Sequence, residues 1–305
     1  MIPVLSKMSQ GFLFLHWIFM DKAIQQHKAN LFHSEHQDGK LLLLPNIWDV
    51  YSAKLVASAG FTSLATASVS LSAIHNYQDG EHIPFSLLVH SVKQITDAVD
   101  LPLTVDMEHG FSSNLTQLHD NIIQLLDAGA VGINIEDRIP GSTTIEELEA
   151  QCRRIETIRN TAVKYDVNLF INARTDLYHL QHSATVINEI IARAKAFQSA
   201  GASGFYPILM NKYEELKSIT EATDLPVNVI LTKDVADLQR LRKCGVRRVS
   251  LGPGLFKYLT SKAVSVLADL KKGSTDLLFN EPQLPSEFLK NLIESSNPLK
   301  GSSIS

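Results

Sequence analysis

The chain has 305 residues, of which 45% are hydrophobic, 28 are basic and 32 are acidic, giving a formal net charge of −4. This length and composition predict a soluble globular protein with one large core or two modest ones. The pI of about 6.3 offers no basic surface for a phosphate backbone, so no nucleic-acid partner is expected. Cys152 and Cys244 are the only cysteines and are far apart in the sequence, which argues against a disulfide framework and suits a cytoplasmic protein.

The amino terminus allows three interpretations. The apolar run GFLFLHWIFM at 11–20 is too short to span a bilayer, so no membrane partner is expected. It could belong to a signal peptide, although no small-residue cleavage site follows it. It could instead be a packed or swapped arm, or residues 1–19 could be a mis-assigned extension before a start at Met20.

From residue 41 onward, a short apolar run followed by a helical segment repeats along the chain. Eight such runs lie at 41–45, 62–66, 101–106, 131–136, 168–173, 203–207, 225–230 and 247–251. Continuous apolar runs are typical of parallel strands covered on both faces, and glycine caps follow several of the helices. The pattern predicts an α/β fold, a closed (β/α)8 TIM-type barrel at residues 20–275, with a doubly wound open sheet as the lesser alternative.

The end of the chain completes this single domain. The segment at 253–272 supplies the eighth helix of the barrel, and its apolar face could be buried in the barrel or against a partner. Residues 276–305 contain a further predicted helix at 284–296 and a tail. No second domain is expected.

Polar residues follow the predicted strands, where such a barrel forms its active site. Asp106 and Glu108 end the third strand in the stretch LTVDMEHGF, Glu136 ends the fourth strand, and Arg174 ends the fifth. Clustered carboxylate oxygens suit Mg²⁺ or Mn²⁺, and the planar fork of an arginine suits a substrate carboxylate. The sequence therefore predicts a site for a small carboxylate metabolite bound to a metal.

Each of these signals also has a purely structural interpretation. An acidic pair at a strand end is often a helix N-cap or a solvated turn. Arg174 could form an ion pair with Asp176, and His109 is expected to support a loop rather than bind a metal. The stretch GPG at 252–254 could receive a phosphate or simply form a tight turn. The joint placement of three acidic strand ends and an arginine favours the functional interpretation.

Several motifs in order resemble the isocitrate lyase/phosphoenolpyruvate mutase superfamily, especially its phosphonomutase-like members. They include VDMEHGF, AGAVGINIEDR, INARTD and GVRRVSLGPGLF, and the likeness covers about residues 30–275. The resemblance implies a (β/α)8 barrel whose eighth helix is swapped between subunits of a homodimer or homotetramer. It also implies a bound Mg²⁺ and a 2-oxo or 2-hydroxy carboxylate substrate that passes through an enolate-like state.

The resemblance also implies roles for individual residues. Asp106 looks like the direct metal ligand, with Glu108 and Glu136 holding metal-bound waters. Asp79 resembles a loop aspartate beside metal and substrate, and Arg174 resembles the arginine that binds the substrate. The expected catalytic residues are thus Asp79, Glu136 and Arg174, and the expected substrate-binding residues are Ala67, Ser68, Val69, Arg174 and, at the end of the seventh strand, Thr232.

Two departures from the family pattern narrow the expected reaction. The loop DRIPGSTTIEE at 137–147 lacks the cysteine that isocitrate and methylisocitrate lyases use as an acid, and it also lacks the lysine, threonine and asparagine of the mutase. The acid or histidine that the family carries near the sixth strand falls at about Ile208. The leading expectation is therefore a Mg²⁺-dependent carbon–carbon lyase or decarboxylase acting on an oxaloacetate-like acid. The alternatives are a P–C bond enzyme and a metabolite-binding protein with a decayed site.

Overall fold

The structure is a computed structural model, and it describes residues 22–37, 39–181, 185–280 and 283–294. The expected extension at 1–19, the proposed start at Met20 and the tail from residue 295 lie outside the described residues. No helix in the described part of the chain is long and apolar enough to cross a membrane.

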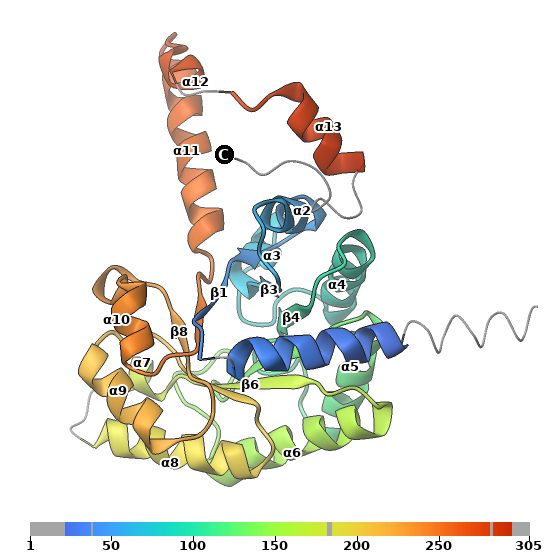
Figure 1. Ribbon diagram of the computed structural model, residues 1–305, viewed down its shortest axis with the longest axis vertical. Helices are drawn as coiled ribbons and strands as arrows, with labels where there is room; N and C mark the ends of the chain where they lie inside the picture. The colour runs from blue at the N-terminus through green and yellow to red at the C-terminus, as the bar shows by residue number, and fades with distance from the viewer. Residues whose placement is uncertain (1–21, 38, 182–184, 281–282, 295–305) are drawn as a thin grey trace, which may run out of the picture.

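The described residues contain nine short strands, and every pair of neighbouring strands is parallel (Figure 1). They are β1 Leu42–Leu44, β2 Asn46–Ile47, β3 Leu64–Thr66, β4 Leu103–Asp106, β5 Gly132–Glu136, β6 Phe170–Thr175, β7 Gly204–Pro207, β8 Asn228–Ile230 and β9 Arg248–Ser250. All eight apolar runs of the sequence thus contain strand residues. Pro45 separates β1 from β2 because proline has no backbone N–H to donate.

The strands close into a barrel. One sheet runs β2-β3-β4-β5-β6-β7 and the other runs β1-β9-β8, so the continuous segment from β1 to β2 joins them on one side. On the other side, a parallel bridge between Phe205 of β7 and Val227 joins them before β8 begins. Eight staves made from the described residues therefore form a closed circle, which confirms the predicted barrel and makes the open sheet wrong.

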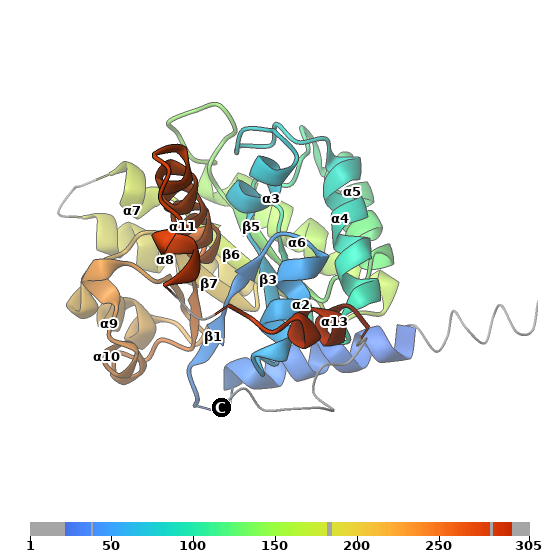
Figure 2. The same cartoon turned by 90° about the horizontal axis from the view of Figure 1, so that it is seen from above.

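Helices alternate with the strands and cover the outside of the barrel (Figure 2). They are α2 Val50–Ser58, α3 Ser68–Ile74, α4 Phe85–Ala98, α5 Leu115–Asp127, α6 Leu148–Tyr165, α7 Leu177–Leu180, α8 Val186–Ser199, α9 Tyr213–Ala222, α10 Leu238–Lys243, α11 Gly254–Lys271, α12 Asp276–Phe279 and α13 Ser286–Glu294. Two of them, α3 and α12, are short and lie outside the helices that the sequence analysis predicted.

The helix at residues 22–37 packs against the amino-terminal end of the barrel. Phe32 of this helix is fully buried, and its ring meets that of Phe170, at the start of β6, edge to face at 5.2 Å between centroids. A Cβ added to Gly132, at the start of β5, would lie 3.1 Å from the Phe32 ring. The absence of a side chain at residue 132 therefore makes room for the aromatic plug.

The carboxyl-terminal helices leave the barrel. In Figure 1, α11 extends away from the strands, and in the described residues this helix buries none of its side chains. The chain then returns so that α13 lies beside α2, where Lys54 Nζ donates to the carbonyl of Ile293 at 2.8 Å. The predicted eighth helix is thus present as a helix, but within one subunit only its start contacts the barrel, where the ring of Phe256 meets that of Trp48 at 5.0 Å between centroids.

We predict that Phe32→Ala lowers the free energy of unfolding by about 3 to 5 kcal/mol, because it leaves a cavity where the aromatic plug closes the barrel. Leu31→Ala on the same helix is the control, since Leu31 is 41% exposed and its truncation should cost less than about 1 kcal/mol. Urea denaturation followed by circular dichroism measures both. Equal losses of stability in the two variants would show that the barrel does not depend on this plug.

Candidate functional site

Three neighbouring strand ends bring the predicted polar side chains together. The parallel register places Asp106 of β4 beside Asn134 of β5, and Glu136 of β5 beside Arg174 of β6. The backbone N–H of Asp106 donates to Oγ1 of Thr66 on β3 at 2.8 Å, which ties a fourth strand end to the group. The carboxyl ends of β3 to β6 therefore form one polar surface at the mouth of the barrel.

The chain turns sharply directly after β4, and this turn positions Glu108. Its φ is 50°, in the left-handed region that side chains with a Cβ rarely adopt, and such backbone strain concentrates at functional sites. The Glu108 carboxylate is almost buried and accepts the N–H of Glu81 at 2.9 Å. Gly110 follows with a φ of 108°, and a Cβ there would lie 2.8 Å from Leu118 Cδ1, so the turn requires glycine.

The segment after β3 supplies the other side of the site. The Ser68 N–H, at the start of α3, donates to Asp106 Oδ2 at 3.2 Å, and the Ser68 side chain lies close enough to Asp79 to oppose the rise in the pKa of that carboxyl. The Glu81 carboxylate accepts a hydrogen bond from the backbone N–H of Phe111 at 2.7 Å, and the backbone N–H of Glu81 donates to the Glu108 carboxylate. These reciprocal bonds fix the loop after β3 against the turn after β4.

Burial and the charges of neighbouring carboxylates raise the pKa of Asp79, Glu108 and Glu136. Burial is the largest cause for Glu108, and the charges of Asp79, Asp106 and Glu136 add to it, so that the pKa of Glu108 rises to about 9. Desolvation and the Asp106 charge also raise the pKa of Asp79, against the hydrogen bond from Ser68. Burial raises the pKa of Glu136, although Arg174 opposes this shift. In the metal-free protein, these carboxylates therefore have too few positively charged neighbours to balance their negative charges.

Of the four carboxylates Asp79, Asp106, Glu108 and Glu136, only Glu136 forms an ion pair within the described part of the chain, and its partner is Arg174. Its Nη1 lies 2.7 Å from Glu136 Oε2, while Nε and Nη2 donate to the two oxygens of Asp176 at 2.7 and 3.0 Å. These two carboxylates raise the pKa of Arg174 and keep it charged despite its burial. A guanidinium has five N–H donors, so two remain for a ligand. The ion pair with Asp176 and a substrate-binding role are therefore compatible.

The acidic group fits a hydrated divalent cation. Asp106 Oδ1 is buried and has no hydrogen-bond partner, whereas ionised carboxylate oxygens in protein interiors normally have one. No three Asp, Glu, His or Cys side chains in the described residues converge closely enough to ligate one ion directly. An ion with few protein ligands and several waters matches the habits of Mg²⁺. Asp106, Glu108 and Glu136 stay the predicted metal-binding residues.

The other predicted residues form no hydrogen bond to these carboxylates within the described part of the chain. The buried hydroxyl of Thr232 has no hydrogen-bond partner there, and its predicted role in substrate binding stays a prediction. His109 turns to Glu146, 3.0 Å from its Oε1, and its carbonyl accepts a hydrogen bond from Arg154. His109 thus supports a loop, as expected. Ala67 and Val69 flank Ser68, and their predicted role in carboxylate binding stays a prediction.

The sequence analysis missed a polar floor beneath the carboxylates. Asn134 Oδ1 accepts bonds from Asn172 at 2.8 Å and from Arg248 Nη2 at 3.2 Å, all inside the barrel. Tyr206, the β7 neighbour of Arg174, is also buried, and desolvation raises its pKa to about 12. The sequence does show polar residues within the apolar runs, such as Asn134 and Glu136, but it does not show which of them face the interior of the barrel.

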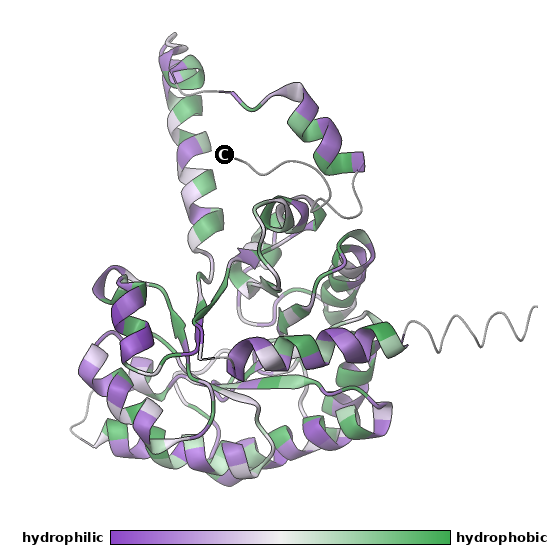
Figure 3. Ribbon diagram, in the orientation of Figure 1, coloured by the Kyte–Doolittle hydropathy of each residue, from purple (hydrophilic) through white to green (hydrophobic). Residues whose placement is uncertain are grey.

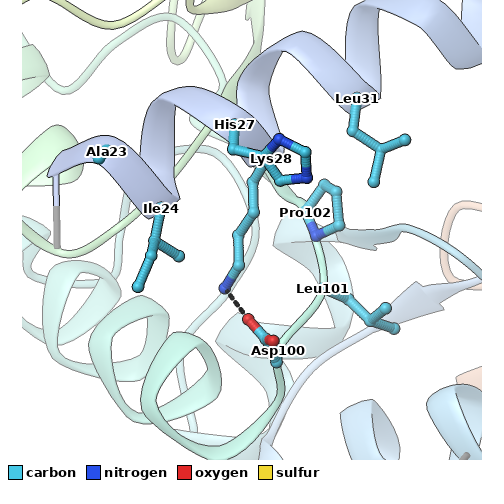
Figure 4. A pocket seen from close by; sticks show the side chains of 8 residues that line it. All are labelled: Ala23, Ile24, His27, Lys28, Leu31, Asp100, Leu101 and Pro102. Carbon is cyan, nitrogen blue, oxygen red and sulfur yellow. Dashed lines mark ion pairs between the residues drawn. The ribbon is translucent and has the colours of Figure 1, made fainter. Parts of the chain in front are cut away.

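A separate pocket of about 540 Å³ lies at the other end of the barrel (Figure 4). Ile24 and Leu31 of the helix at 22–37 line this pocket, together with Pro102, which directly precedes β4. Lys28 and Asp100 also line it and form an ion pair at 2.8 Å. Active sites of such barrels form at the carboxyl ends of the strands. Because Asp106 ends the strand that Pro102 precedes, this pocket is distinct from the candidate site.

The closed parallel barrel and its carboxylate surface define a (β/α)8 protein with an enzyme-like site. Residues 32–271 match the model of the phosphoenolpyruvate phosphomutase family, and the chain belongs to this family. The resemblance found in the motifs is thereby confirmed.

Individual relatives differ in what is known of them. An uncharacterized protein of Mycobacterium tuberculosis is 33% identical over 244 residues, which cover 78% of this chain and 89% of that protein. An oxaloacetate decarboxylase of Pseudomonas putida is 27% identical, over 83% of this chain and 88% of the relative. A crystal structure from Burkholderia cenocepacia, provisionally assigned as a phosphonomutase, is 36% identical with a TM-score of 0.75, covering 80% of this chain and 99% of that one.

We predict that Glu108→Gln flattens the pH dependence of stability in the metal-free protein. The pKa of Glu108 is raised from 4.5 to about 9, so the folded state keeps a proton that the unfolded state releases. This carboxylate therefore lowers the free energy of unfolding progressively as the pH rises from about 4.5 toward 9, and glutamine removes that loss. Urea denaturation with a chelator, at about pH 5 and about pH 8.5, measures the difference.

Glu156→Gln, on an exposed position of α6, is the control for this pH series. It should lose as much stability between the two pH values as the wild-type protein. The same loss in Glu108→Gln would contradict the raised pKa of Glu108.

Proposed function

We propose that this chain is a Mg²⁺-dependent lyase that acts on a small 2-oxo or 2-hydroxy carboxylic acid through an enolate-like state. The observation that carries the proposal is the group of Asp79, Asp106, Glu108 and Glu136 beside Arg174, with one buried oxygen of Asp106 unpartnered. The oxaloacetate decarboxylases among the relatives support decarboxylation or C–C cleavage of an oxaloacetate-like substrate.

The metal would be held by Asp106 directly and by Glu108 and Glu136 through water. Bound there, Mg²⁺ supplies a Lewis acid that stabilises negative charge developing on an oxo acid. Mn²⁺ has the same preference for oxygen ligands and could replace it.

The side chains of this chain bind and orient the substrate. Arg174 uses its two remaining N–H donors for the substrate carboxylate, while Glu136 and Asp176 hold its guanidinium in place. Asp79 is exposed and lies near Ser68 and Asp106, both of which influence its pKa, so it can contact a substrate bound at the mouth of the barrel. Expulsion of carbon dioxide needs no strong acid to protonate the leaving group, which suits a site without the family's loop cysteine.

A P–C bond reaction is the second candidate, and the relative provisionally assigned as a phosphonomutase favours it. The loop at 137–147 argues against it, because this loop lacks the lysine, threonine and asparagine of the mutase pattern. Turnover of phosphonopyruvate by the purified protein distinguishes the two reactions. A third candidate is a metabolite-binding protein with a decayed site. Titration of oxalate with and without Mg²⁺ tests it: tight binding that Asp106→Ala weakens supports a working centre, and no binding supports decay.

We also propose that the active form is a homodimer or homotetramer in which α11 packs against a neighbouring subunit. This helix has large exposed apolar side chains, among them Tyr258 at 59%, Val264 at 58% and Leu267 at 64%. Figure 3 shows hydrophobic residues at intervals along the part of α11 that extends from the barrel. An exposed apolar helix face of this kind is typical of a subunit interface. The two free cysteines support a reducing, cytoplasmic compartment.

We predict that wild-type protein with Mg²⁺ releases pyruvate from at least one acid in a panel of oxaloacetate-like oxo acids, and that Asp106→Asn lowers kcat/KM by about 100-fold or more. The physical reason is the loss of the carboxylate charge that holds the metal. Asp120→Asn, exposed on α5, is the matched control and should keep wild-type activity. Release of no product from any acid by the wild-type protein would contradict the proposed lyase activity.

We predict that Val264→Glu combined with Leu267→Glu converts the oligomer to smaller species, because two charges would have to be buried against the partner. Light scattering coupled to size exclusion measures the mass. Ser261→Glu combined with Ser265→Glu adds the same charge at polar positions of the same helix and serves as the control. A wild-type protein that is already monomeric, or a Val264/Leu267 variant with unchanged mass, would rule out this interface.

A further inference from the structure

The loop between β5 and α6 forms a small antiparallel hairpin at the mouth of the barrel. Arg138 and Ile145 form an antiparallel bridge, and the N–H of Ile139 donates to the carbonyl of Thr144 at 3.1 Å. This is the loop in which the family's cysteine is missing. No residue of this loop can therefore act as the cysteine acid of the lyases, and the contacts of the loop residues indicate a different role.

The base of the hairpin is fixed to its surroundings. Asp137 is fully buried; its Oδ1 accepts the N–H of Asp176 at 2.9 Å, and its Oδ2 accepts Arg193 Nη1 at 3.2 Å. Arg193 also donates to the carbonyl of Glu146 at 2.9 Å, and the Glu146 N–H donates back to the Asp137 carbonyl at 2.7 Å. The backbone of the next residue, Arg138, is thus held at a defined place beside Asp176.

The Arg138 guanidinium lies at the outer edge of the site. Its Nη1 is 3.9 Å from Asp176 Oδ2, the same oxygen that accepts Arg174 Nη2 at 3.0 Å. Asp176 is buried, whereas the Arg138 side chain is 39% exposed and makes no hydrogen bond within the described residues. An ion pair this long and this exposed stabilises little, so a ligand can recruit the guanidinium at small cost.

We propose that Arg138 is a specificity-determining residue, which binds the distal carboxylate of an oxaloacetate-like substrate and so makes the site prefer dicarboxylic over monocarboxylic acids. This inference rests on the proposed function, in which Arg174 and the metal hold the reacting end. Asp176 links both guanidinium groups, so Arg174 contacts the inner end of an extended dicarboxylate and Arg138 contacts its outer end. A planar guanidinium can bind a carboxylate with two parallel hydrogen bonds.

Malate and lactate test this assignment, because these two hydroxy acids differ by the distal carboxylate. Calorimetric titration with saturating Mg²⁺ should show that the wild-type protein binds malate more tightly than lactate, by roughly 10- to 100-fold for one charge-assisted contact. Arg138→Gln should abolish this preference and leave the affinities for lactate and oxalate unchanged. Arg138→Lys, which keeps the charge but not the fork, should retain part of the preference. Arg153→Gln, exposed on α6, should behave like the wild-type protein.

The outcomes separate this inference from the proposed function. If the wild-type protein binds oxalate with Mg²⁺ but does not prefer malate, or if Arg138→Gln keeps the preference, the role of Arg138 is wrong and the proposed function stands. If the wild-type protein binds none of the three acids, the proposed function fails, and the role of Arg138 fails with it. The midpoint of thermal unfolding, measured for each variant, checks that the substitution of this exposed side chain leaves the fold intact.

Discussion

The mutual repulsion of carboxylates at the mouth of a parallel barrel is the constraint on which the rest of the site depends. Parallel strands in register deliver Asp106 and Glu136 to the same end of the barrel, and the turn after β4 adds Glu108. Burial of Glu108 and Glu136 favours their neutral forms, as the pKa of about 9 for Glu108 shows. Arg174 alone pairs directly with the group in the described residues, so a divalent cation is the natural complement.

The fold maintains this unfavourable arrangement through fixed backbone and a polar floor. Glu108 holds a left-handed conformation because Gly110 turns the chain and Glu81 binds its carboxylate. Beneath it, Asn134 and Arg248 replace the apolar side chains that usually fill a barrel interior. These contacts cost folding energy that the surrounding aliphatic core offsets, and strain maintained in this way is a sign of functional preorganisation.

The sequence predicted the architecture well because the barrel depends on local patterns that repeat. Every apolar run contains a strand, and glycine caps marked the helix ends. The convergence of Asp106, Glu136 and Arg174 also followed from strand order alone. The polar floor could not be predicted in the same way, because which side of a short strand faces the interior depends on the closure of the whole barrel. Nor could the sequence reveal that Arg138 lies beside Asp176, since the course of the hairpin is set by Arg193, about fifty residues further along the chain.

The most direct test of the account is a crystal structure of the protein with Mn²⁺ and oxalate, with the metal located by its anomalous scattering. We expect one peak next to Asp106, with Glu108 and Glu136 bound to the waters of the metal, and with Arg174 in contact with oxalate while it keeps its ion pair with Asp176. No peak at the carboxyl ends of β4 and β5, or a metal bound elsewhere while Asp106 Oδ1 stays unpartnered, would contradict the central claim.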